Sequence, residues 1–231
     1  MREVLRNERK FLLDAVRSAR KIHQLRPLLH EDINNGPEGY MVRSLYFDTG
    51  DDGDLFDKAH GINVRRKLRL RIYDTSGDSA MLGLKQKQGV QQKKRSLRLR
   101  REEAERLCHG DYSPLLSYND PFAAECYGLM HRRCYQPRVI NQYSRLAFVV
   151  PENSTRITFD RYVTATQSSF DLFDPKLLLT PVLDPSAVVL EVKFNGFLLT
   201  YVKELLRGVE ESELAVSKYV LARQLTAFAS L

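Results

Sequence analysis

Cationic and apolar residues alternate along two neighbouring stretches of the chain, and this alternation limits the folds that the chain can adopt. In the stretch 67–72, Lys or Arg occupies every second position and Leu or Ile the positions between. After a polar turn, Lys85 and Lys87 repeat the pattern beside Leu84. Side chains on a β-strand point alternately to opposite faces. The pattern therefore predicts two strands of a sheet that is charged on one face and apolar on the other.

The positive charge is concentrated in the segment 65–101. This segment has thirteen Lys and Arg against Asp74 and Asp78, whereas the whole chain of 231 residues has a formal charge of only +7. Ordinary wet faces mix both signs, because like charges on neighbouring strands repel. Two cations about 7 Å apart repel by roughly 2 kcal/mol at an effective dielectric near 20. Exposure to solvent is one interpretation of the charged face, and the shortage of acids favours a second, the binding of a polyanion.

Composition and the motifs that are missing argue against several other classes. The chain has 43% hydrophobic residues, which is enough for a core and untypical of disorder. It has no apolar run of membrane-spanning length and no signal peptide, and its three sparse cysteines predict reduced thiols in a cytoplasmic protein. Scattered histidines disfavour a zinc site, and neither GxGxxG nor GxxxxGK[ST] occurs. Tyr73 is the only aromatic residue from 65 to 101, so no nucleic acid is expected as a partner.

Strand-like and helix-like segments follow one another along the chain. Strands are predicted at 4–12, 41–47, 64–73, 81–88, 92–99, 138–150, 155–169 and 188–194. Helices are predicted at 15–28, 54–60, 101–108, 121–133, 198–207 and 217–228. About eight strands at this spacing favour a closed barrel or a sandwich. The interior of an eight-stranded barrel holds side chains or one slender ligand, so inward-facing cations would line a narrow positive tunnel.

Charged residues recur at matching positions on the later predicted strands. Arg145 lies in NQYSRLAF, and Arg156 and Asp160 share one face of TRITFDRY. Glu191 and Lys193 share one face of the otherwise apolar VVLEVKFNG. Charged residues in such a strand pair with one another or belong to a functional site. Two interpretations of Glu191 stay open, a counter-ion of a neighbouring cation and a member of a functional site.

Nine short motifs, in this order, resemble the VTC (vacuolar transporter chaperone) domain: NERKFLL, SLYFDT, LRLRIY, LKQK, QKKRSL, YSRLAF, TRITFD, VLEVKF and VSKYVLA. That family belongs to the triphosphate tunnel metalloenzymes, which are relatives of the CYTH proteins. The resemblance covers nearly the whole chain and implies one domain, 1–231, of the α+β class. The implied architecture is an eight-stranded antiparallel β-barrel forming a basic tunnel, with helices packed outside and a C-terminal helix. The implied activity is that of a polyphosphate polymerase, which transfers the terminal phosphoryl group of ATP to a growing polyphosphate chain.

The resemblance also assigns roles to individual residues. Glu191 would bind Mn²⁺ or Mg²⁺, with Glu8 as a weaker second ligand. Arg71, Arg145 and Glu191 would be the catalytic residues. Lys94 leaves the register of the fifth predicted strand open by one residue. The implied phosphate-binding cations are Lys10, Arg69, Arg71, Lys85, Lys87, Lys93, Arg95, Arg145, Arg156, Lys193 and Lys218.

One departure from the family pattern bears on the direction of catalysis. Tunnel hydrolases carry Glu-x-Glu-x-Lys on the first strand, and here Arg6 stands at the first carboxylate. This favours synthesis over hydrolysis. A triphosphatase or polyphosphatase of the same fold, and a non-catalytic receptor for polyphosphate or inositol phosphates, stay as alternatives. The expected ligands are ATP and inorganic polyphosphate or triphosphate, and association with a separate membrane protein is left open.

Several further residues have simpler expected roles. Asp160 is expected to orient Arg156, and Asp48 to form a turn. Tyr46 and Tyr143 are expected in the core. Three arginines are expected to face solvent: Arg98, Arg100 and Arg101.

Overall fold

The structure is a computed structural model of the whole chain, and it describes residues 6–89, 91–213 and 217–224. The chain divides into two compact units, each built from segments that are distant in the sequence. Unit 1 comprises Met1–Met41, Tyr143–Val163 and Pro181–Ser217, and unit 2 comprises Val42–Gln142, Thr164–Thr180 and Lys218–Leu231. No helix in the described ranges is long and apolar enough to cross a membrane.

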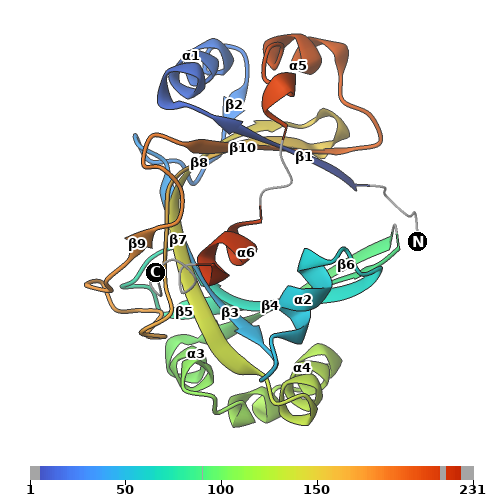
Figure 1. Cartoon of the computed structure of the whole chain (residues 1–231), viewed down its shortest axis with the longest axis vertical. Coiled ribbons are helices and arrows are strands. Elements are labelled where there is room, and N and C mark those ends of the chain that lie inside the picture. Colours follow the sequence, from blue (N-terminus) through green and yellow to red (C-terminus); the bar gives the residue numbers. More distant parts are fainter. Residues whose placement is uncertain (1–5, 90, 214–216, 225–231) are drawn as a thin grey trace. The chain divides into compact units, whose positions relative to one another are not determined.

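Unit 1 contains a sheet with one apolar and one charged face. Its strands are β1 (Arg6–Leu13), β10 (Val188–Asn195) and the unit 1 parts of β8 (Thr155–Thr166) and β7 (Gln136–Val150), with β2 (His30–Glu31) on the edge of β7. The apolar face packs against α1 (Ala15–Leu25) and α5 (Thr200–Leu205), which lie on one side of β1 and β10 in Figure 1. Phe11, Phe148 and Phe159 are among the largest buried side chains of this core.

Helix α1 begins where the sequence predicts and ends earlier. Asp14 caps it by accepting a hydrogen bond from the backbone N–H of Arg17 at 2.8 Å, as the sequence indicates. The helix ends at Leu25 instead of residue 28. Pro27 follows closely and has no N–H to donate to a further turn, so the helix stops before it.

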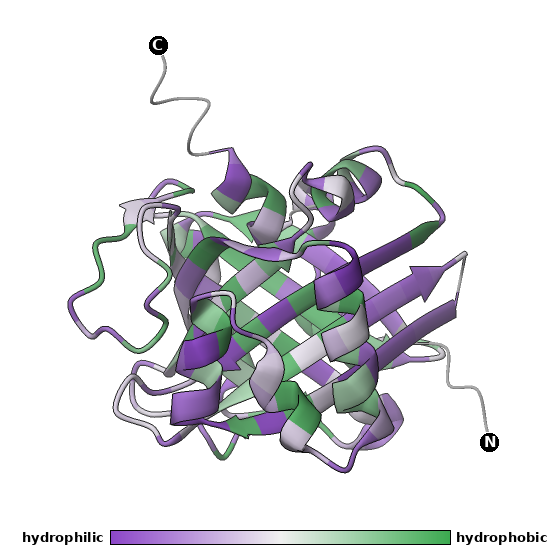
Figure 2. Ribbon diagram, turned by 90° about the horizontal axis from the view of Figure 1, so that it is seen from below, coloured by the Kyte–Doolittle hydropathy of each residue, from purple (hydrophilic) through white to green (hydrophobic). Residues whose placement is uncertain are grey.

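In unit 2, strands that are consecutive in sequence pair with one another. The strands are β3 (Tyr40–Asp48), β4 (Val64–Ile72), β5 (Ser79–Gln88) and β6 (Gln91–Arg100). Leu68, Leu70, Leu82 and Leu84 are fully buried on one face. That face lies under α3 (Arg101–Cys108) and α4 (Pro121–Arg132), which contact β5 and β6. Figure 2 shows hydrophilic and hydrophobic residues alternating along parts of the strands, as the period of two requires.

Short elements complete the two units. Unit 2 also has α2 (Gly53–Ala59) and α6 (Lys218–Arg223), whereas the last residues of the predicted helix 217–228, from 225 onward, lie outside the described residues. Residues 4 and 5 of the first predicted strand also lie outside them. The remaining short elements are η1 (Ser113–Ser117), η2 (Glu152–Ser154), η3 (Glu210–Ser212) and β9 (Thr180–Pro181).

The α+β class is confirmed, and every pairing with a defined register is antiparallel. The strand order is β1-β10-β8-β7-β3-β4-β5-β6, with β2 on β7 and β9 on β8. Within the described ranges no pairing joins β1 to β6, so the sheet is open in this order. Closure into a barrel, and the assignment of 1–231 to one domain, therefore stay predictions.

Candidate functional site

The register of unit 2 gathers cations on one face of its sheet. Lys67 lies opposite Lys85, which in turn lies opposite Lys94. Side chains at opposite positions of antiparallel strands point to the same face. We call this surface the cationic face; its cations are Arg65, Lys67, Arg69, Arg71, Lys85, Lys87, Lys94, Arg98 and Arg100. In the described parts of β3 to β6, Asp48 is the one acid that the register places on this face.

The alternation of charge and leucine in β4 and β5 thus has the predicted result. The leucines are buried under helices on one side of the sheet, and the cations occupy the other side. Arg69 and Arg71 are half-buried, and Arg71 Nε donates a hydrogen bond to the hydroxyl of Ser44 on β3 at 3.1 Å. Neighbouring strands therefore hold at least one of these arginines in a defined direction.

The pairing of β6 with β5 gives the register that the sequence leaves open by one residue. Lys93 and Arg95 lie on the opposite face from the other cations, and Lys94 takes the place assigned to them. Arg95 instead pairs with Glu125 of α4, through a 2.6 Å bond to Oε1, and lies 4.9 Å from the ring centre of Phe122. The reason is the pairing of Gln88 with Gln91, which sets every later position of β6.

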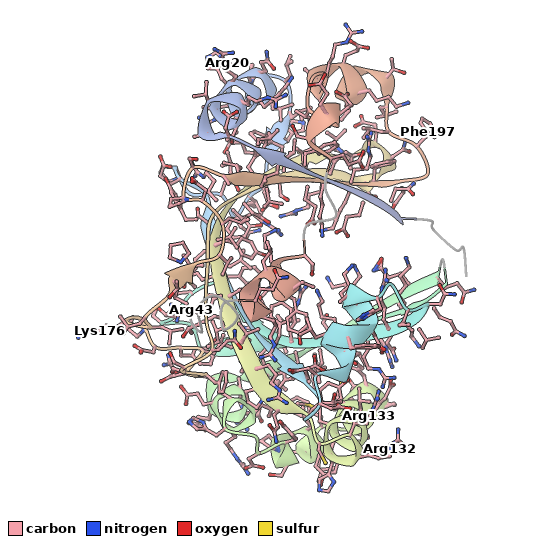
Figure 3. All side chains as sticks on the ribbon, viewed as in Figure 1. Arg20, Arg43, Arg132, Arg133, Lys176 and Phe197 are labelled. Atoms are coloured by element: carbon pink, nitrogen blue, oxygen red, sulfur yellow. The ribbon has the colours of Figure 1, made fainter. Side chains whose placement is uncertain are left out.

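Two of the three arginines expected in solvent are exposed, and the third is half-buried. Arg98 and Arg100 are exposed, at 71% and 80% of the side chain, as predicted. Arg101 is half-buried; its guanidinium lies 4.5 Å from the ring centre of Phe173 and pairs with Glu105 at 2.8 Å. Cations outside the cationic face include Arg132 and Arg133 at the end of α4 and Lys176 (Figure 3).

Helix α6 is attached to the cationic face through tyrosines. The ring of Tyr219 lies 5.0 Å from that of Tyr46, and the Lys67 ammonium lies 5.4 and 5.3 Å from the two ring centres. The Tyr219 hydroxyl donates to Oδ2 of Asp48 at 2.5 Å. Lys218, a predicted phosphate ligand, is the first residue of this helix.

Asp48 does more than form a turn. Its buried carboxylate accepts hydrogen bonds from the backbone N–H groups of Thr49, Asp54 and Leu55 at 2.8–2.9 Å, and so satisfies the start of α2. It also holds α6 through Tyr219. The motif SLYFDT therefore joins two helices to β3.

Unit 1 carries a second charged face, in which acids and cations alternate. Glu8 on β1 lies opposite Lys193 on β10, and Lys10 lies opposite Glu191. The Lys10 ammonium is 2.8 Å from Oε1 of Glu8 and 3.8 Å from Oε2 of Glu191, while the Lys193 ammonium contacts the other oxygen of Glu191. Glu191 is only 5% exposed. These four residues form a two-by-two square of alternating charge, which we call the charge square.

Two arginines of the same unit are each held by a buried carboxylate. Arg145 binds Asp160 through two parallel bonds of 2.6 and 2.8 Å. Arg156 contacts Asp32 at 2.5 Å and donates to the hydroxyl of Tyr40 at 2.9 Å. The prediction that Asp160 orients Arg156 is therefore wrong, because the bidentate partner of Asp160 is Arg145 on β7.

The pKa values of Arg145 and Asp32 are shifted within these pairs. Burial opposes the charge of Arg145, but Asp160 outweighs burial and holds the pKa of Arg145 well above its usual value. Burial likewise opposes ionisation of Asp32, but hydrogen bonds from Asn34 and the charge of Arg156 lower its pKa. Asp32 lies in a loop far from Arg156 in sequence, and no sequence signal pointed to it.

The pKa of Lys193 in the charge square is shifted in the opposite direction to that of Arg145. Burial lowers its pKa to about 6, with Arg145 and Lys10 acting in the same direction and Glu8 and Asp160 against it. An anion bound beside Lys193 would raise this pKa again, because it would stabilise the charged ammonium. Tyr143, whose ring centre lies 5.2 Å from the Arg145 guanidinium, is buried as predicted.

The two faces differ in their balance of charge. Among the described residues of β3 to β6, nine cations of the cationic face accompany one acid, Asp48. In unit 1, the four cations of the predicted site are matched by four carboxylates: Lys10, Lys193, Arg145 and Arg156 by Glu8, Glu191, Asp160 and Asp32. The first arrangement suits an anion, whereas the second has carboxylates that can also serve a divalent cation.

The carboxylates of the charge square fit a divalent ion such as Mg²⁺ or Mn²⁺. No group of three or more His, Cys, Asp or Glu suited to a metal occurs in the part of the chain that the structure describes. Glu8 and Glu191 supply two carboxylates from adjacent strands. Mg²⁺ and Mn²⁺ are often held by one or two carboxylates while water and phosphate oxygens supply the other ligands. The donor set fits such an ion, provided that a phosphate ligand draws the lysines away from the carboxylates.

Comparison with known proteins adds the following findings. The model of the VTC domain family matches residues 5–227. A search of curated proteins found no match. The crystal structure of a "putative adenylate cyclase (bh2851)" from Bacillus halodurans aligns with a TM-score of 0.53 and 15% identity over 92% of this chain and 95% of that chain. The PH1819 protein from Pyrococcus horikoshii OT3 aligns with a TM-score of 0.47 and 14% identity over 94% and 97%. At 15% identity the first likeness concerns the fold alone, and the match to the family model confirms the resemblance carried by the nine motifs.

Proposed function

The chain belongs to the VTC domain family, and we propose that it is a metal-dependent phosphotransferase that adds the terminal phosphoryl group of ATP to a polyphosphate chain. The observation that carries this proposal is the cationic face, on which nine cations share three adjacent strands. Alternate residues of one strand stand about 7 Å apart, so the face presents charge at regular intervals to an extended polyanion. Closure of the strands into the tunnel implied by the resemblance is part of the proposal.

Arginines and lysines of the cationic face would share the binding of phosphate groups. Arg69 and Arg71 present guanidinium forks, which bind two phosphate oxygens at once. Lys85, Lys87 and Lys94 add point charges on the neighbouring strands. A ligand with many phosphates gains from each added contact, which favours polyphosphate over a single phosphate.

The residues of unit 1 would act on the reacting phosphates. Arg145, fixed in direction by Asp160, would stabilise negative charge on the phosphoryl group together with Lys10 and Lys193. Glu191 would be the main protein ligand of Mn²⁺ or Mg²⁺, with Glu8 beside it. When bound, the ion would neutralise phosphate charge and align the oxygens.

Transfer to a phosphate acceptor makes few chemical demands on the protein. Phosphoryl transfer depends mainly on positioning and on stabilisation of charge. The terminal phosphate of a growing chain is already ionised near neutral pH, so the acceptor needs no strong general base. Arg6, at the position of the first hydrolase carboxylate, further supports synthesis over hydrolysis.

The decisive experiment follows the fate of the terminal phosphate of ATP. The purified protein is incubated with ATP and Mn²⁺ or Mg²⁺, and a polyphosphate gel is run beside a phosphate-release assay. A metal-dependent ladder of polyphosphate supports the proposal. Released phosphate without a ladder identifies a hydrolase, and binding of tripolyphosphate without either product identifies a receptor.

A further inference from the structure

Tyr46 is a buried tyrosine that faces cations. It lies on β3, is 4% exposed and stands opposite Arg69 of β4. Lys67 and Arg71 flank Arg69 on the same face, and the Lys67 ammonium lies 5.4 Å from the Tyr46 ring centre. Three cations therefore surround one phenol in a buried place.

The other neighbours of Tyr46 bring little opposing charge. On its own strand Asp48 is engaged by Tyr219 and by the start of α2. From α6, which packs on Tyr46, the facing group is Tyr219 itself. On β7, which also neighbours β3, Arg138 is bound to Asp52 at 3.3 Å and to backbone carbonyls.

The two adjacent tyrosines are in opposite electrostatic environments. Burial and the carboxylate of Asp48 both raise the pKa of Tyr219, which stays a hydrogen-bond donor. Burial also opposes ionisation of Tyr46, but the charges of Arg69, Lys67 and Arg71 and a hydrogen bond from Arg69 outweigh it and lower its pKa to about 7. An unperturbed tyrosine has a pKa near 10.

We propose that Tyr46 is the proton-linked counter-ion of the cationic face: its phenolate balances Lys67, Arg69 and Arg71 in the free protein and takes up a proton when a polyphosphate binds to them. This inference rests on the proposed function, because it needs a polyanion at this face. Phosphate oxygens would offset the field of the three cations and repel the phenolate, so protonation accompanies binding. Tyr46 thereby balances the three cations without a further permanent carboxylate, beside the engaged Asp48, to compete with the ligand.

The direction in which binding affinity changes with pH follows from this proton uptake. Below pH 7 the phenol of the free protein is already protonated, and binding requires no proton. Above pH 7 binding takes up about one proton, so each further pH unit weakens affinity by up to about tenfold. Tyr46→Phe removes the ionisable hydroxyl and keeps the ring that packs on Tyr219.

The first measurement concerns the free protein. Tyrosinate absorbance near 295 nm, followed from pH 5.5 to 9, should show one tyrosine that ionises near pH 7. This step should be lost in Tyr46→Phe and retained in the matched variant Tyr219→Phe. A titration in which Tyr46→Phe matches the wild type would overturn the inference, whatever the ligand.

The second measurement concerns binding of tripolyphosphate by calorimetry at several pH values, in buffers that differ in ionisation enthalpy. The affinity of Tyr46→Phe relative to wild type should be near 1 at pH 6 and about tenfold higher at pH 8, with about one proton less taken up. Proton uptake by Lys193 persists in both proteins and cancels in the ratio. A ratio that does not change with pH contradicts the role of Tyr46 while leaving the proposed function intact, whereas no binding by the wild type contradicts both.

Discussion

The Arg145–Asp160 pair should be coupled strongly enough to be measured in the free energy of unfolding. Its two hydrogen bonds of 2.6 and 2.8 Å are parallel, the Asp160 side chain is fully buried and that of Arg145 is 11% exposed. Asp160→Asn keeps the shape and one acceptor, but leaves the guanidinium without a charged partner.

The expected cost follows from that burial. Removal of one partner from a buried ion pair typically costs about 3–5 kcal/mol, because the other charge stays buried and uncompensated. Since Asn retains one acceptor, we expect about 3 kcal/mol for Asp160→Asn. In a protein of this size that corresponds to a fall in Tm of roughly 6–12 °C.

A double-mutant cycle tests the reasoning without any assay of activity. Urea unfolding of wild type, Asp160→Asn, Arg145→Gln and the double variant should give a coupling energy of about 2 kcal/mol or more. The exposed pair Arg98–Asp78 supplies the control, and Asp78→Asn should cost no more than about 0.5 kcal/mol. Additive costs for Asp160 and Arg145, within about 0.5 kcal/mol, would show that the pair does not act as a unit.

Three further predictions concern the cationic face, the proposed metal ligand Glu191 and the buried carboxyl group of Asp54. Lys94→Ala should weaken tripolyphosphate binding about three- to tenfold in a titration at low salt. Lys93→Ala, one residue away on the opposite face, should leave the affinity nearly unchanged. Equal losses would indicate a diffuse electrostatic attraction. Glu191→Gln should abolish metal-dependent turnover while tripolyphosphate still binds in calorimetry, and turnover near the wild-type rate would remove Glu191 from the reaction. Burial raises the pKa of Asp54 to about 7, so its contribution to stability is full below pH 4 and is lost as the pH rises from 4 to 7. The free energy of unfolding of Asp54→Asn, relative to wild type, should therefore be about 1–3 kcal/mol higher at pH 8 than at pH 4 in urea unfolding. A difference between the two proteins that does not change with pH would contradict the raised pKa of Asp54.

The sequence alone was sufficient wherever the decisive interaction is local. The alternation in β4 and β5 determines that Arg69 and Arg71 share one face and Leu68 and Leu70 the other, because successive side chains of any strand point to opposite sides. The cap of α1 at Asp14 is likewise local, since its partner lies three residues away.

The nine motifs predicted the family, and the order and type of most elements follow the sequence pattern. The side chains within the site were harder to place. In β6 the choice between Lys94 and Arg95 depended on the register of its pairing with β5, and a shift of one residue exchanges the two faces completely.

Tertiary structure decided which charges meet. Asp160 and Arg156 are close in the sequence and share a strand, yet Asp160 binds Arg145 on β7, and Arg156 is held by Asp32 from a distant loop. Such pairs depend on which strands lie next to one another, and no local pattern records that choice.

Tertiary structure also decided the pKa values of two neighbouring tyrosines. Tyr46 and Tyr219 are chemically identical, and their rings are 5.0 Å apart. The pKa of Tyr46 is lowered because the charges of Arg69, Lys67 and Arg71 outweigh its burial, and that of Tyr219 is raised by burial and by Asp48, which accepts its hydrogen bond. The sequence determined that a tyrosine, a basic strand and an acid would be present; only the folded chain brings each charge within a few ångströms of one hydroxyl, the range at which electrostatic energy is large enough to move a proton.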